Sequence, residues 1–168
     1  MSDLIEPESH TPFDSAHYRQ VLGHFPTGVT VISSIDGEEP VGMAVGSFAS
    51  LSLEPPLVLF CAAHSSSTWP RVKATGRFCV NILAEDQEDV CRTLASKGTD
   101  KFAGIGWKHS ALGSPIIDGV LGWIDCEIAD VVAEGDHDVV IGHVRGLDVA
   151  HEGGPLVFFR GGYGRFTQ

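Results

Sequence analysis

Hydroxyl side chains and glycines alternate with apolar residues across residues 42–58. Ser50 and Ser52 lie two positions apart, so strict alternation along a strand places both hydroxyls on one face. Gly42 and Gly46 allow another backbone or a flat ligand to come close. Such a strand presents hydroxyl and backbone N–H groups to a polar planar ring without using a charge. The alternative interpretation is an edge strand with solvated serines.

A second candidate site is the polar loop at residues 64–68, which leads into a short predicted helix. Thr68 is a residue type that caps helices, and Pro70 suits the first turn. The start of a helix has free N–H groups and a partial positive charge, which suit a phosphate. Lys101 is a further cation that can reach a phosphate. The alternatives are an ordinary polar loop and a solvated lysine.

His137 lies in an acidic turn between Asp136 and Asp138, and we single it out among eight histidines. It is either a ligand-binding group or an exposed turn residue. Near the end of the chain, Arg160 can pair with a phosphate or a carboxylate, and Tyr163 can stack on a ring. The alternative for that segment is a cap over the mouth of the fold. The sequence suggests no clustered zinc ligands, so metal chemistry is not expected.

The composition is typical of one globular domain of 168 residues, with 43% hydrophobic and 20% charged residues. A formal net charge of -11 argues against nucleic acid and anionic membranes, because both attract basic patches. The four cysteines are scattered without C-x-x-C spacing, which gives no support to a zinc ribbon. The first ten residues do not resemble a signal peptide, and no apolar run spans a bilayer. We expect a cytoplasmic protein.

The elements that must position these groups follow from hydrophobic period and turn residues. A first helix begins at Asp14 or Ser15, and its apolar residues recur at helical spacing. A hairpin turn is expected at Asp36 and Gly37. Helices also follow Thr68 and Asp86, and residues 98–114 are mostly loop. The apolar residues of the first helix are Tyr18, Val21, Leu22 and Phe25. The expected strands cover residues 27–34, 41 onward, 57–62, 77–83, 121–132, 138–149 and 156–159.

Many strands, few short helices and the lack of βαβ alternation predict a closed or half-closed antiparallel barrel. We expect residues 1–13 to form a flexible tail and residues 14–168 to form one domain.

The order and spacing of several segments resemble the short flavin reductases, the NAD(P)H:flavin oxidoreductase components of two-component monooxygenases. The resemblance extends from about residue 17 to residue 166. In many members, Thr and Asn occupy the positions of Ala44 and Gly46, so in this chain backbone groups must replace those side chains. The matching segments are residues 25–31, 42–58, 65–70, 77–83, 86–87, 100–102, 135–137 and 155–163.

The resemblance implies a mostly β fold, the antiparallel split β-barrel that binds FMN, with a few short helices. It implies hydride transfer from NADH or NADPH to FMN or FAD in a homodimer, with the reduced flavin passing to a separate flavin-dependent monooxygenase. Hydride transfer needs no catalytic acid or base from the protein. The alternatives are a non-catalytic flavin store or sensor, and a related split-barrel oxidase or a heme- or deazaflavin-binding relative.

The resemblance also assigns site residues. It places His137, Arg160 and Tyr163 on the NAD(P)H side of the site. The residues it places beside the flavin are Thr27, Gly28, Val29, Thr30, Ala44, Val45, Gly46, Ser47, Phe48, Ser50, Leu51, Ser52, Ser67, Thr68, Cys79, Val80, Asn81, Lys101 and Phe102.

Overall fold

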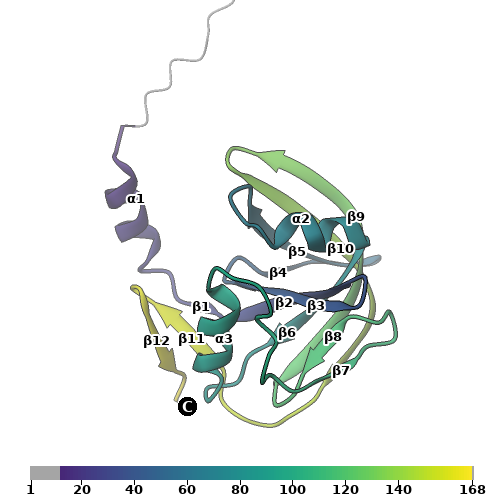
Figure 1. Cartoon of the computed structure of the whole chain (residues 1–168). Helices are drawn as coiled ribbons and strands as arrows, with labels where there is room; N and C mark the ends of the chain where they lie inside the picture. Colours follow the sequence, from purple (N-terminus) through teal and green to yellow (C-terminus); the bar gives the residue numbers. More distant parts are fainter. Residues whose placement is uncertain (1–11, 168) are drawn as a thin grey trace, which may run out of the picture.

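A curled seven-stranded antiparallel sheet dominates the computed structural model, which describes residues 12–167 (Figure 1). The strands at its two edges are not hydrogen-bonded to each other, so the barrel is split, and the predicted antiparallel split barrel is confirmed. The predicted tail lies almost wholly outside the described residues. In spatial order the strands are β3 (Glu39–Val45), β2 (Thr30–Asp36), β6 (Arg77–Ile82), β9 (Gly122–Glu134), β10 (His137–Val149), β5 (Pro56–Ala63) and β4 (Ala49–Leu53).

Two smaller sheets flank the barrel. One contains β1 (Thr27–Gly28), β11 (Leu156–Phe159) and β12 (Gly162–Arg165), and the other contains β7 (Trp107–His109) and β8 (Pro115–Ile117). The expected strand at 27–34 is therefore divided between two sheets. The short strands β7, β8 and β12 were not predicted, because three residues are too few to show a period and β12 contains two glycines, whereas the equally short β11 is a continuous apolar run.

The three helices are α1 (Ser15–Leu22), α2 (Trp69–Thr75) and α3 (Glu88–Ala95). Asp14 caps α1 as predicted, accepting a hydrogen bond from the His17 amide at 2.7 Å.

Thr68 occupies the N-cap position of α2, with Pro70 in the first turn as predicted, whereas the N-cap of α3 is Gln87 and not Asp86. Thr68 makes no side-chain cap bond. Instead the Ser66 hydroxyl accepts from the Trp69 amide at 3.1 Å. The helix expected after Asp86 begins only after Gln87, whose side chain is turned to other partners. The Ser66 hydroxyl thus serves the first amide of the helix and not the later amide that a Thr68 side chain would accept from, so residue type alone does not predict the cap bond.

The central strands β2 and β6 are covered on both faces. Alternation in β6 sends Phe78 and Val80 into the barrel interior, where they pack with Phe60, and sends Cys79 to the opposite face. That opposite face is covered by α3, which packs on β2 and buries Cys91, and by β8, which packs on both β2 and β6. Strands buried on both sides are held from two directions, so they form a rigid frame for the loops at the split.

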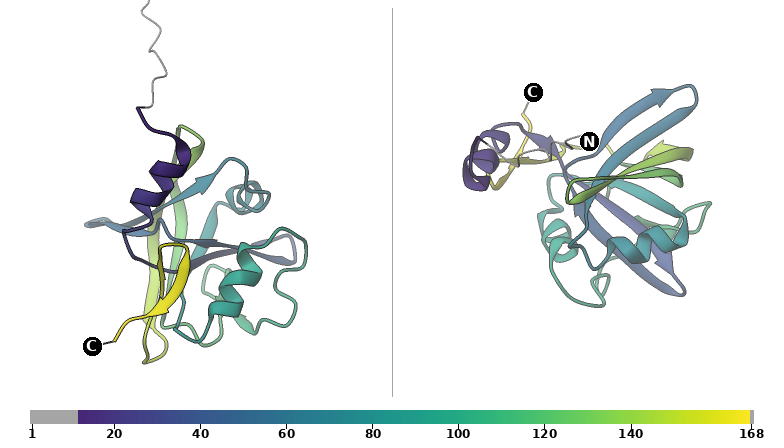
Figure 2. Two further views of the ribbon diagram at one scale, coloured as in Figure 1. Left: turned by 90° about the vertical axis from the view of Figure 1, so that its left-hand side faces the viewer. Right: turned by 90° about the horizontal axis from the view of Figure 1, so that it is seen from above.

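Helix α1 stands off the barrel beside the β11–β12 hairpin (Figures 1 and 2). A backbone bond from the Arg160 amide to the Gly23 carbonyl, 2.9 Å, ties the end of the helix to that hairpin. The apolar face predicted for α1 does not pack on this chain, since Tyr18, Val21 and Phe25 are 51%, 54% and 76% exposed. Among residues 12–167, no helix is both long and apolar enough to cross a membrane.

Candidate active site

Three neighbouring cavities beside the split of the barrel share lining residues. The first, of about 470 Å³, and the second, of about 200 Å³, share Thr27, Val29 and Gly46. The third, of about 490 Å³, shares Ala44 and Ala95 with the second. We refer to these three cavities together as the groove.

The first cavity is largely apolar and suits a flat ring. Its walls include the side chains of Phe25, Phe48 and Leu156. A Cβ atom added at Gly46 would lie 3.2 Å from the Thr27 Oγ1, so the glycine keeps open a space that a side chain would fill. The lack of a side chain at Gly46 is thus part of the shape of the cavity.

The third cavity is polar and cationic. It is lined by the hydroxyl-rich residues 65–68 and by Lys97 and Lys101. The Lys101 Nζ donates to the Leu94 carbonyl at 3.0 Å and to the Thr68 Oγ1 at 3.2 Å, and partial burial lowers its pKa. The groove therefore runs from an apolar end to an end with hydroxyls and a fixed ammonium group. A flavin, with its planar ring and phosphate-bearing tail, fits this order.

Two of the predicted flavin-site hydroxyls are already engaged with the backbone. The Thr30 Oγ1 donates to the Val45 carbonyl at 2.9 Å and is buried. The Ser47 Oγ accepts from the Cys61 amide at 2.9 Å and donates to its carbonyl at 3.1 Å. These hydroxyls shape the wall of the groove, and backbone groups and the Thr27 hydroxyl are left for a ligand.

Ser50, Leu51 and Ser52 do not line the groove, and the expectation that the two serines share a face is wrong. Ser50 pairs with Val58 of β5, whereas Ser52 pairs with the adjacent Leu57. The register shift between them is a bulge, and a bulge breaks the period-two alternation on which the expectation rested. The two serines therefore face opposite sides of the sheet.

The predicted residues of β6 and Phe102 also do not line the groove, because they are buried. Cys79, Val80 and Asn81 have no exposed surface, and Phe102 is 4% exposed. The Asn81 Nδ2 donates to the Ser33 Oγ at 2.9 Å, and its Oδ1 accepts from the Ile117 amide at 2.8 Å. Asn81 is hydrogen-bonded, as a buried amide must be, and its partners dock β8 onto the sheet.

Of the residues predicted for the NAD(P)H side, Tyr163 lines the groove. Its hydroxyl lies 3.3 Å from the Cys91 Sγ, and the Arg92 guanidinium carbon lies 4.8 Å from the centre of its ring. The bond with Cys91, together with burial, raises the pKa of Tyr163 to about 12. Tyr163 thus forms a fixed, neutral wall of the second cavity.

The other two predicted residues lie further out. His137 begins β10 opposite Ala63, a residue that lines the third cavity, and its Nδ1 lies 2.6 Å from the Asp136 Oδ1. His137 therefore pairs with a residue of the third cavity but does not itself line the groove. Arg160 adopts a left-handed φ of 51° in the turn before β12 and is exposed, outside the groove walls.

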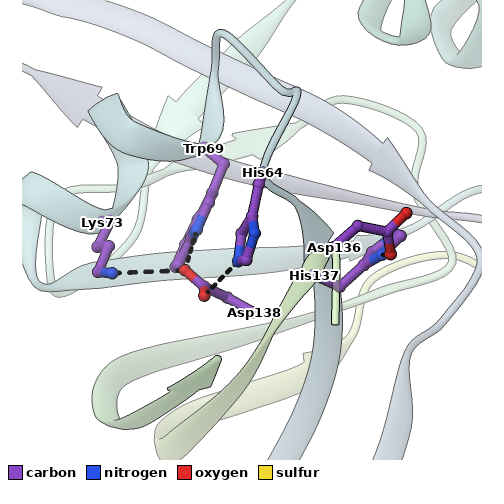
Figure 3. Close-up of polar contacts among 6 residues, drawn as sticks. All are labelled: His64, Trp69, Lys73, Asp136, His137 and Asp138. Carbon is purple, nitrogen blue, oxygen red and sulfur yellow. Dashed lines mark hydrogen bonds and ion pairs between the residues drawn. The ribbon is translucent and has the colours of Figure 1, made fainter. Parts of the chain in front are cut away.

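Sequence reasoning missed a buried carboxylate next to His137. The Asp138 side chain is 8% exposed and faces three donors, as Figure 3 shows. The Trp69 Nε1 and the His64 Nε2 both lie 2.8 Å from its oxygens, and the Lys73 Nζ lies at 3.4 Å. The bonds from Trp69 and His64 hold the pKa of Asp138 at about 2. The one signal in the sequence is an acidic residue at the start of an apolar strand.

Comparison with known proteins settles the family. A family model described as the flavin reductase like domain matches residues 22–167. The chain belongs to the flavin reductase-like family. A flavin reductase of Pseudomonas putida is 50% identical over 155 residues, which cover 92% of this chain and 91% of that protein. HsaB of Mycobacterium tuberculosis, the reductase subunit of a flavin-dependent monooxygenase, is 53% identical over 165 residues, 97% of this chain and 84% of that protein.

Solved structures agree with the fold. The nitrilotriacetate monooxygenase component B homologue from Mycobacterium thermoresistibile superposes with a TM-score of 0.88 at 51% identity, covering 90% of this chain and 86% of that one. The NADH:FAD oxidoreductase SgcE6 of Streptomyces globisporus, solved with NAD and FAD fragments, gives 0.86 at 34% identity, covering 99% and 98%. This flavin reductase is thus an enzyme that uses a nicotinamide coenzyme to reduce flavin, as the sequence predicted.

The buried carboxylate makes stability depend on pH. Because the pKa of Asp138 is about 2 in the folded chain and 3.8 ordinarily, the ionised group stabilises the fold above about pH 4, and this contribution is lost as the pH falls through about 2. We expect Asp138→Asn to lower the midpoint of thermal unfolding at neutral pH and to approach the wild type at low pH. Asp130→Asn, on the exposed part of β9, is the control. A deficit of equal size at every pH would contradict this assignment.

Proposed function

We propose that this flavin reductase binds flavin along the groove, reduces it with NADH and releases it to a separate flavin-dependent monooxygenase. The observation that carries the proposal is the order of the groove, with an apolar end at Phe48 and a hydroxyl-rich, cationic end at Lys101. The names of similar proteins support the partner, since HsaB is a reductase subunit and another relative is the reductase component of a trigonelline monooxygenase. A further relative is an NADH-dependent FMN reductase.

The chemistry of the step belongs to the two cofactors, because a bound flavin accepts a hydride from the nicotinamide ring. The protein binds and orients the flavin and the nicotinamide coenzyme, and it excludes water from them. Apolar walls at Phe25 and Phe48 remove water from the ring, and Gly46 leaves room for it. Backbone N–H groups near Thr27 and Gly46 offer hydrogen bonds, and Lys101 offers a charge to the phosphate.

Steady-state NADH and NADPH oxidation with added FMN or FAD tests the activity and its preferences. We expect oxidation to depend on added flavin, because flavin is the proposed acceptor of the hydride. Transfer to an oxygenase is tested by coupling the reaction to a flavin-dependent monooxygenase encoded nearby. A folded chain that binds flavin without accelerating NAD(P)H oxidation would contradict the proposal.

Gly46→Leu tests the position of the ring. The added side chain would meet Thr27 and fill the cavity, so we expect flavin affinity to fall by roughly 1–3 kcal/mol, the usual cost of overpacking. Ala111→Leu, in an exposed loop away from the groove, is the matched control. Fluorescence titration with FMN measures both. Equal affinity in a folded Gly46→Leu variant would exclude this position for the ring.

His137→Ala tests the nicotinamide side. We expect the apparent Michaelis constant for NADH to rise, because one lost hydrogen bond to a charged group costs on the order of 1–2 kcal/mol of binding free energy. Flavin affinity should stay nearly intact. Initial rates and flavin titration on one preparation separate the two effects. If flavin affinity falls and the NADH constant holds, the two sides of the site are assigned the wrong way round.

A homodimer and a cytoplasmic location complete the proposal. The exposed face of α1, with Val21 54% and Leu22 52% exposed, supports symmetric pairing that covers it. The cysteines are free thiols, as a reducing compartment requires. We expect light scattering to give twice the mass of one chain, and Val21→Glu to shift it toward the monomer. A monomeric wild type at micromolar concentration would refute the dimer.

A further inference from the structure

The buried carboxylate of Asp138 lies where it can control one wall of the groove. Residues 65–68, which line the third cavity, are bracketed by His64 and Trp69. The His64 Nε2 and the Trp69 Nε1 each lie 2.8 Å from an oxygen of the same carboxylate (Figure 3). One carboxylate on β10 therefore bonds to the residues at both ends of a four-residue loop that lies between β5 and α2.

We propose that Asp138 is a positioning residue that holds residues 65–68 in the arrangement that binds the phosphate end of flavin, and so sets flavin affinity. This inference rests on the proposed function of the groove.

The carboxylate is suited to this task and cannot be replaced by a neutral group of the same shape. Trp69 is 3% exposed and its indole N–H only donates, and the ammonium of Lys73, at 3.4 Å, also only donates. A carboxylate accepts from all of them, whereas an amide must turn an NH₂ group toward one donor. Because these groups are buried, losing one partner leaves the other as an unpaired polar group inside the protein, and this costs folding free energy.

The start of the loop is also bonded to the turn that carries His137. The His64 amide donates to the Asp136 carbonyl at 2.9 Å, and Asp138 follows His137 directly in the chain. Within the loop, the Ser66 hydroxyl accepts a hydrogen bond from the Trp69 amide at 3.1 Å, so its position depends on that of Trp69. Releasing Trp69 would therefore loosen the loop from its far end as well.

Asp138→Asn and Trp69→Phe are the test variants. The first removes the charge at nearly constant volume, and the second removes one donor while keeping an aromatic ring. Asp130→Asn is the matched control, because it makes the same change on an exposed part of the same β-hairpin. All three are prepared as full chains without flavin.

The first measurement is amide hydrogen exchange of the flavin-free protein. We expect exchange at residues 65–69 to rise about tenfold in Asp138→Asn and Trp69→Phe, which corresponds to roughly 1.4 kcal/mol of local stability. Exchange in β2 and β6 should match the wild type. Unchanged exchange at residues 65–69, or an equal rise throughout the chain, overturns the proposal.

The second measurement is the dissociation constant for FMN by fluorescence titration, with kcat at saturating FMN alongside. We expect the constant to rise about tenfold in both variants while kcat stays within about twofold. A merely structural role would lower the amount of folded enzyme and leave the constant unchanged, and that result overturns the proposal. A wild type that neither binds FMN nor oxidises NADH would instead refute the proposed function, because exchange tests Asp138 without flavin.

Discussion

The site depends on a sheet that curls without closing. β3 and β4, the edges of the seven-stranded sheet, do not pair with each other. Residues 46–48 connect those two edges and supply walls to the groove. Backbone groups that a closed barrel would consume in its ladder are left without strand partners there, and such groups need hydrogen bonds from elsewhere. A ligand with a polar rim meets that need, so the failure to close creates the binding capacity.

The frame and the site use polar residues for different purposes. Deep in the sheet, Asn81 and Ser33 satisfy each other and dock β8, which makes the frame stiff. At the groove, the hydroxyls of Ser47 and Thr30 are hydrogen-bonded to backbone atoms, so these residues shape the wall and offer no free hydroxyl to a ligand. Lys101 is held by carbonyls and a hydroxyl before any ligand arrives. The enzyme thus contributes preorganisation to a reaction whose electrons come from its cofactors.

Sequence patterns predicted what depends on neighbours in the chain. The long strands, the hairpin turns at Gly37 and Gly135 and the Asp14 cap follow from local residue types, and the structure has them all. Resemblance to a family supplied the activity. Whatever depended on partners distant in sequence was missed: Asn81 and Asp138 are satisfied by residues 34 to 74 positions away. The bulge beside Ser50 depends on the register in which β4 pairs with β5, so the alternation of residues within β4 could not predict it.

The burial of the cysteines has a consequence for an enzyme that releases reduced flavin in air. Reduced flavin that meets oxygen yields hydrogen peroxide, and peroxide attacks thiolates far faster than thiols. Cys79, Cys91 and Cys126 are buried, and burial raises the pKa of each thiol, most strongly for Cys79. Cys79 and Cys126 stay protonated and shielded from this by-product, whereas Cys91 lies at the wall of the second cavity, where its thiol is bonded to Tyr163. Only Cys61, partly exposed on β5, meets the solvent into which that by-product is released.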